Sequence, residues 1–238
     1  MPRLKTINLI DRVHCPLLEV INTGNIEGIG LISTSFTQWG NARSIFSDKS
    51  VSNASPNVHT MICKNILLFG SSCIYACDSI VDVYAPRCKW IGKYQTRWNT
   101  NWSLFYLEDV VAIPSDFFDD NDSRYSTLNI VINKPVESSS DLPVLYKTGS
   151  VTTPYANSYD KLNVSGTGGL ESATFTSATE SDIDTGARRW GHCNIYVPDS
   201  CVDIYKQTSP YTKLADRIYP ISELSQEYKN MIKSNIGV

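Results

Sequence analysis

The stretch NIYVPDSCVDIYKQTSPYTKLADRIYPISEL, residues 194–224, shows the organisation of this chain most clearly. Its first apolar run, IYV, is a short β-type segment that Pro198 ends, because proline has no N–H to give to a strand ladder. Asp199 stands where a helix N-cap belongs, and Ser209-Pro210 repeats that signal with proline at the first helical position. The pattern predicts a strand followed by two short helices, a unit that suits a cap over the open end of a repeated structure.

Residues 195–224 resemble, nearly without a gap, the C-terminal cap of the BspA-like leucine-rich repeat proteins of Bacteroidales bacteria and of their phages. The resemblance implies a mainly β fold: a degenerate leucine-rich-repeat-like β solenoid with a small C-terminal helical cap. Such proteins are mostly adhesive or structural, so the resemblance also favours a protein without enzymatic activity. Because the first residues also lack a signal peptide, we expect the chain to be encoded by a phage of Bacteroidales and not to be an exported bacterial protein.

Two blocks of the N-terminal half carry the same apolar pattern, and we interpret them as an internal duplication. Each residue of the second block follows its counterpart by 62 positions: Cys77, Ile80 and Val83 answer Cys15, Leu18 and Ile21. Weaker matches to the pattern begin at Leu107, Leu128 and Leu170. Repeats of this family run roughly 20 to 29 residues. The alternative is that the same pattern arises by chance in any β-rich chain.

We expect two parts in the chain. Residues 1–193 form a degenerate repeat domain with an insertion near 33–57, and 127–134 alternates like a strand. Residues 194–238 form the strand–helix–helix cap and a terminal helix over 223–234, with Ser222 as its N-cap. Because this helix lies beyond the cap, we expect its apolar stripe to be an oligomer contact; the stripe comprises Leu224, Tyr228, Met231 and Ile232.

Composition limits the classes of partner. The chain has 238 residues, of which 42% are hydrophobic and 19% are charged, as in an ordinary globular protein. A formal net charge of −3, with no basic cluster larger than Arg188-Arg189, argues against nucleic-acid binding. No apolar run is long enough for membrane insertion, and the first residues lack the apolar core of a signal peptide. We therefore expect assembly in a host cytoplasm.

No residue pattern points to catalysis or to a cofactor. His14-Cys15 and His192-Cys193 are neighbours in sequence, so on a strand their side chains point to opposite faces and form no dyad. The seven cysteines lack the C-x2-C spacing of zinc sites and are expected to be reduced, and the acidic loop at 116–122 lacks the glycine and glutamate of an EF-hand. A glycosidase needs two facing carboxylates. Four acidic residues are available for this without any distinctive spacing: Asp82, Glu108, Asp109 and Glu171.

The aromatic segment at 90–106 is the candidate binding region. Tryptophan and tyrosine combine a flat apolar face with a polar group, which suits both glycan stacking and protein interfaces. The candidate residues are Tyr94, Trp98, Trp102 and Tyr106, and the polar neighbours of Trp98 and Trp102 favour exposure of these two or a place at an interface. The alternative is an ordinary β core.

The sequence thus predicts a non-enzymatic structural or adhesive protein. We expect a phage virion component, such as a head fibre, a collar or a tail-associated decoration, that mediates assembly or host-surface attachment. Its expected partners are other virion proteins, further copies of itself and a host-surface glycan. The alternatives are a bacterial or prophage-encoded adhesin at the cell surface, and a carbohydrate-active enzyme.

Overall fold

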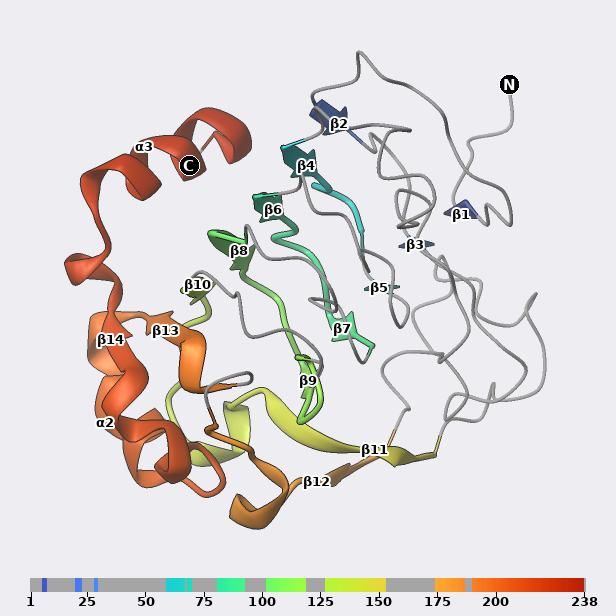
Figure 1. The fold of residues 1–238 in the computed structure, drawn as a ribbon, viewed down its shortest axis with the longest axis vertical. Coiled ribbons are helices and arrows are strands. Elements are labelled where there is room, and N and C mark those ends of the chain that lie inside the picture. Colours follow the sequence, from blue (N-terminus) through green and yellow to red (C-terminus); the bar gives the residue numbers. More distant parts are fainter. Residues whose placement is uncertain are drawn as a thin grey trace.

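Two sheets enclose one apolar core in the computed structural model of the chain (Figure 1). The structure describes residues 6–7, 20–22, 28–29, 59–66, 68–69, 81–92, 102–118, 127–152, 174–186 and 190–237. The insertion expected near 33–57 and the start of the duplicated block at Cys15 and Leu18 lie outside these residues. Inward-facing side chains of both sheets fill the core, among them Met61, Val83 and Phe105 from one and Ile113 and Leu145 from the other.

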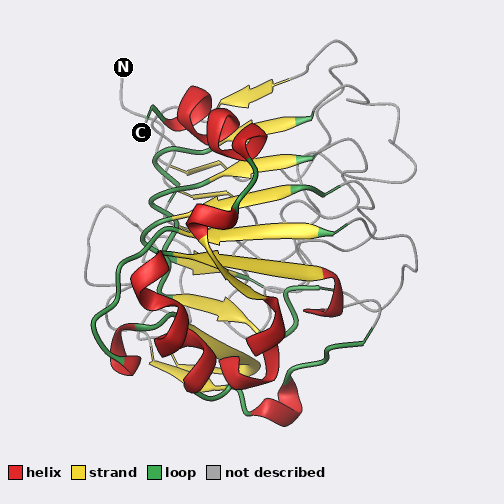
Figure 2. Ribbon diagram, turned by 90° about the vertical axis from the view of Figure 1, so that its left-hand side faces the viewer, coloured by secondary structure: helices red, strands yellow, loops and turns green. Residues whose placement is uncertain are grey.

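Sheet B is parallel throughout. In spatial order it consists of β14 (Ile218–Pro220), β13 (Cys193–Val197), β10 (Leu128–Ile132), β8 (Leu104–Leu107), β6 (Asp82–Tyr84), β4 (Thr60–Ile62) and β2 (Val20–Asn22). Its strands lie one above the other in Figure 2.

Sheet A is mixed. It consists of β1 (Thr6–Ile7), β3 (Gly28–Ile29), β5 (Leu68–Phe69), β7 (Trp90–Ile91), β9 (Ala112–Pro114), β11 (Val144–Thr152) and β12 (Thr174–Ser177), and β12 alone is antiparallel to its neighbour. From β2 to β11 the chain alternates between the two sheets, so each sheet gains one strand in turn.

The strand register explains the 62-residue offset seen in the sequence. Met61, Val83 and Phe105 are paired across three adjacent strands, and each lies 22 residues beyond the last. Ile21 pairs with Met61, which stands 40 residues on, so Ile21 and Val83 lie two strands apart with β4 between them. The matching blocks are therefore not neighbours in the sheet.

The prediction of a leucine-rich-repeat-like solenoid is wrong. Two sheets, mostly parallel, combine with helices in an α/β-like arrangement, whereas a leucine-rich repeat lines a horseshoe with its strands. The physical reason lies in strands such as β8, which is buried at all four positions. The sequence of a parallel strand that is covered on both faces is a continuous apolar run. It lacks the alternation of apolar and polar residues found in a strand with one face exposed to water.

The C-terminal segment differs in part from the expected cap. The predicted strand at 195–197 is confirmed as β13, and a 3-10 turn, η7 (Asp199–Cys201), leads into α2 (Val202–Gln207). Asp199 does not cap that helix; its carboxylate accepts the N–H of Ser222 at 3.0 Å. The second predicted helix is the 3-10 segment η8 (Tyr211–Arg217). Residues Ile218–Pro220, expected at the end of that helix, form the strand β14.

The terminal helix is confirmed as α3 (Gln226–Ile236), which begins three residues and ends two residues later than predicted and follows the 3-10 turn η9 (Ile221–Glu223). Ser225, not Ser222, is its N-cap, and Gly237 ends it at a φ of 86°, a left-handed conformation that favours glycine. The helix lies over the outer face of sheet B (Figure 2). No helix among the described residues is both long and apolar enough to cross a bilayer.

The apolar stripe of α3 is covered by its own chain. Leu224 and Ile232 are buried, and Tyr228 and Met231 pack beside them against the outer-face residues of sheet B. The Tyr228 hydroxyl also hydrogen-bonds the Ser103 hydroxyl at 2.5 Å. The stripe needs no second copy of the chain to leave water, so the reason for assigning it to an oligomer contact no longer holds.

Candidate functional site

The aromatic candidates do not form an exposed patch. Trp102 is only 2% exposed and stacks on Phe105 in the core, with ring centroids 5.9 Å apart and planes within 7° of parallel. Its predicted exposure is therefore wrong. Tyr106 is equally buried, and its hydroxyl donates to Glu108 Oε1 at 2.6 Å and accepts from Asn133 at 3.1 Å. Tyr94 and Trp98 lie outside the described residues.

The candidate carboxylates do not converge on one cleft. Glu108 is held by the Tyr106 hydroxyl, and Asp109 beside it is exposed. Asp82 pairs with Leu104 at the start of β8, whereas Glu108 follows the end of that strand. At about 3.3 Å per residue, four residues separate the Asp82 and Glu108 positions by roughly 13 Å along the strand, beyond the spacing of glycosidase carboxylates. Glu171 lies outside the described residues.

The cysteines that the structure describes pack in the interior. Cys63, Cys88, Cys193 and Cys201 are all buried, and burial raises the pKa of the Cys193 thiol well above its ordinary value. The Cys201 sulfur accepts the N–H of Val136 at 3.4 Å, which ties η7 to the segment after β10. In the described part of the chain, no three His, Cys, Asp or Glu side chains come together as metal ligands.

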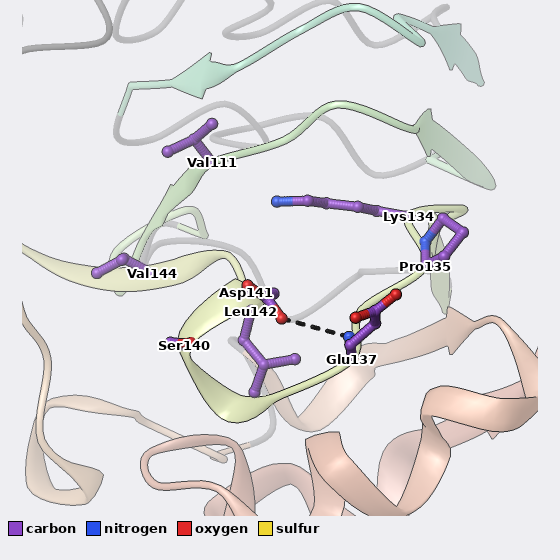
Figure 3. Close-up of a pocket in the computed structure, with 8 residues that line it drawn as sticks. All are labelled: Val111, Lys134, Pro135, Glu137, Ser140, Asp141, Leu142 and Val144. Atoms are coloured by element: carbon purple, nitrogen blue, oxygen red, sulfur yellow. Dashed lines mark hydrogen bonds between the residues drawn. The ribbon is translucent and has the colours of Figure 1, made fainter.

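A hollow of about 590 Å³ lies where the chain passes from β10 in sheet B to β11 in sheet A (Figure 3). We name it the Lys134 hollow. Most of its lining comes from that connection, and one residue directly precedes β9. The lining comprises Val111, Lys134, Pro135, Glu137, Ser140, Asp141, Leu142 and Val144.

A tight 3-10 turn, η3 (Ser139–Asp141), shapes one side of the hollow. Asp141 Oδ2 accepts the Ser138 hydroxyl at 2.8 Å, the Ser138 N–H at 2.9 Å and the Glu137 N–H at 3.3 Å. These hydrogen bonds, mainly those from Ser138, lower the pKa of the exposed Asp141 carboxyl. Asp141 is thus an ionised anchor that fixes the turn, with Leu142 buried just after it.

The same turn occurs a second time, at η5 (Glu180–Asp182). Thr179 gives its hydroxyl and its N–H to Asp182 Oδ2 at 2.8 and 2.9 Å, as Ser138 does to Asp141. Lys147 pairs with the other Asp182 oxygen at 2.9 Å, and this lysine together with Thr179 lowers the Asp182 pKa to about 2. The signal in the sequence, Ser/Thr-x-Ser-Asp followed by an aliphatic residue, was missed.

Lys134 is the cation of the hollow. Its side chain extends across the space toward Val111 (Figure 3), and its ammonium donates to the Val110 carbonyl at 3.3 Å. Burial lowers the Lys134 pKa, although the Asp141 and Asp109 charges oppose this effect. An ammonium carries three donors, so this hydrogen bond leaves two for solvent or a ligand.

An exposed apolar side chain lies beside that cation. Val111 is 39% exposed, and among the described residues it is the large apolar side chain classed as exposed. Leu142 and Val144 continue the apolar lining below it (Figure 3). The hollow therefore offers hydrogen-bonding groups around an apolar patch.

A second, smaller hollow of about 200 Å³ also borders η3 and shares Ser140, Leu142 and Val144 with the first. Hydroxyl groups and prolines dominate its remaining lining, which includes Ser139, Pro143, Ser177, Thr208, Ser209 and Pro210. Tyr211 closes its base by donating its hydroxyl to the Pro143 carbonyl at 2.7 Å. The two hollows together form one surface feature, which we call the η3 trough.

No family model, curated protein or solved structure matches the chain.

Proposed function

We propose that this chain is a non-enzymatic structural and adhesive protein of a phage particle, and that its η3 trough binds a host-surface glycan. The observation that carries the binding role is the exposed Val111 side chain next to the partly desolvated Lys134 ammonium. The particle setting is supported by the resemblance of residues 195–224 to the cap of a family that is mostly adhesive or structural.

The chemistry of the trough suits a sugar. A sugar ring has an apolar C–H face and a rim of hydroxyls, so its binding site needs a patch of carbon surface with donors and acceptors around it. Val111 and Leu142 supply the carbon surface, Lys134 supplies donors, and Glu137 and Ser140 supply acceptors. The second hollow continues this surface with further hydroxyls, so two adjacent sugar units of a chain can be accommodated.

The acidic groups of the trough favour binding over hydrolysis. A glycosidase needs one carboxylic acid that is protonated near neutral pH, together with a second, ionised carboxylate. Asp141 is held ionised by Ser138 and is committed to its own turn. Glu137 is the other carboxylate of the lining, and Asp141, with its lowered pKa, does not suit the role of the general acid.

Replacement of Lys134 by methionine should weaken glycan binding. Loss of a charged hydrogen bond in a partly desolvated site costs about 1.5–3 kcal/mol, or roughly tenfold to a hundredfold in affinity. The affinity is measured by calorimetric titration with purified capsular polysaccharides and mucin glycans. Val111→Asp should reduce binding as well, because it places a charge on the apolar patch.

Lys147→Met is the matched control, since Lys147 is an exposed lysine paired with Asp182 and does not line the trough. It should bind as the wild type does. Equal losses in the Lys134 and Lys147 variants would show that the trough is not the binding site. Steady release of reducing sugars by the wild type would show instead that the protein is an enzyme.

A further inference from the structure

Asp82 is a buried acid on the outer face of sheet B. Met61 and Val83 point into the core, so Thr60 and Asp82, their neighbours on the strands, point outward to the side that α3 covers. Asp82 is 5% exposed. The other buried polar residues among those described, Thr60 and Asn129, carry no ionisable group. Its Oδ1 atom is buried and accepts no hydrogen bond from the described residues. Such a carboxylate is costly to ionise in place.

The groups around Asp82 come from three elements. His59, just before β4, hydrogen-bonds the Thr60 hydroxyl through Nδ1 at 2.8 Å, and its charge favours the ionised acid. The negative charge of Glu227, in the first turn of α3, disfavours ionisation of Asp82 and raises its pKa. Tyr84 lies two residues beyond Asp82 on β6. Burial outweighs these charges and raises the Asp82 pKa from 3.8 to about 6.

The covering helix is attached through one face. Its apolar residues pack on Tyr84, Leu104, Tyr106 and Val131 of sheet B, and at its end Lys64 donates to the Ile236 carbonyl at 3.3 Å. Gln226, Glu227 and Asn230 on the opposite face are exposed. If α3 lifts from the sheet, water therefore reaches Asp82 while the core between the two sheets stays closed.

We propose that α3 is a pH-sensitive strap, which closes over the outer face of sheet B while Asp82 is protonated and loosens when the Asp82 carboxylate ionises. Asp82 binds its proton more tightly when α3 covers it than when it is exposed to water. Protonation of Asp82 therefore stabilises the packing of α3 on sheet B. This contribution is complete below about pH 4 and is lost as the pH rises through about 6. The difference between the ordinary Asp82 pKa of 3.8 and the raised value of about 6 means that the equilibrium constant for packing of α3 on the sheet is roughly a hundredfold smaller above this pH range than below it. Loosening uncovers the tyrosine rings of the sheet face.

Amide hydrogen exchange on the whole chain tests the strap. Protection of the α3 amides, corrected for the intrinsic exchange rate, is measured at about pH 5, where part of the Asp82 contribution remains, and at about pH 7.5, where it is lost. In the wild type, α3 protection should fall by about tenfold at the higher pH, while α2 keeps its protection and reports on the rest of the fold. Equal protection of α3 at both pH values would overturn the proposal, and so would a parallel loss in α2, because that is global unfolding.

Matched variants assign the effect to one carboxyl. Asp82→Asn, a neutral residue of the same shape, should hold α3 protected at both pH values, and Asp203→Asn, which removes an exposed acid of α2, should keep the wild-type dependence. Should Asp82→Asn fold poorly, Glu227→Gln replaces it as the test: it removes a charge that disfavours ionisation and should shift the transition to lower pH. A wild-type pH dependence in a folded Asp82→Asn chain, or an unshifted transition in Glu227→Gln, contradicts the strap.

Discussion

Removal of residues 194–238 will prevent the remaining chain from folding in soluble form. β13 lies between β10 and β14, so the deletion leaves the edge of β10 unpaired and opens the core. Open strand edges pair with other chains and cause aggregation. The deleted part also carries apolar side chains that the core needs: Ile195, Val197, Tyr205, Tyr211, Leu214 and Ile218 are each at most 2% exposed.

Sedimentation and circular dichroism of the truncated chain measure this outcome. A chain shortened only by residues 225–238 is the control, because it loses α3 and keeps β13 and β14 in sheet B. This control should remain folded with lower stability, whereas the longer truncation should sediment as aggregate. A soluble 1–193 fragment that unfolds cooperatively would mean that the C-terminal segment does not complete the core.

Replacement of Trp102 by alanine should destabilise the protein by about 3–5 kcal/mol, the usual cost of removing a buried aromatic side chain. The indole stacks on Phe105, and Phe105 in turn packs edge-to-face on Phe117, so the cavity lies at the centre of an aromatic cluster. Urea denaturation followed by circular dichroism gives the free energy of unfolding.

Trp102→Phe is the conservative control and should lose less, since a ring stays in contact with Phe105. Both variants should bind glycans with wild-type affinity under conditions where they are folded. Unchanged stability together with lost binding would instead place Trp102 on a functional surface.

Local signals in the sequence predicted single elements well. β13, α3 and the strand at 128–132 were all expected, because proline, serine and glycine mark their limits and their apolar residues are regularly spaced. The division into two sheets was not predicted. Strands such as β7, which is two residues long and fully buried, show no alternation by which a covered face can be told from an exposed one.

The exposure of Trp102 was mispredicted for a related reason. The exposure of Trp102 was inferred from its polar neighbours, but adjacent residues in extended chain point to opposite sides. Ser103 meets α3 on the outside of the sheet while Trp102 enters the core. The Lys134 hollow brings Val111 next to residues more than twenty positions later, and only the paired Ser/Thr-x-Ser-Asp turns gave any local sign of it.

The spacing of paired strands also sets an order of assembly during synthesis. Residues paired between β4, β6 and β8 are 22 positions apart, whereas Leu128 in β10 pairs with Cys193 in β13, 65 positions later. Closing the longer loop costs about 1 kcal/mol more in chain entropy. On the ribosome, 65 further residues must therefore be synthesised after Leu128 before β13 can pair with the edge of β10. We expect this interval to be when the nascent chain most needs a chaperone.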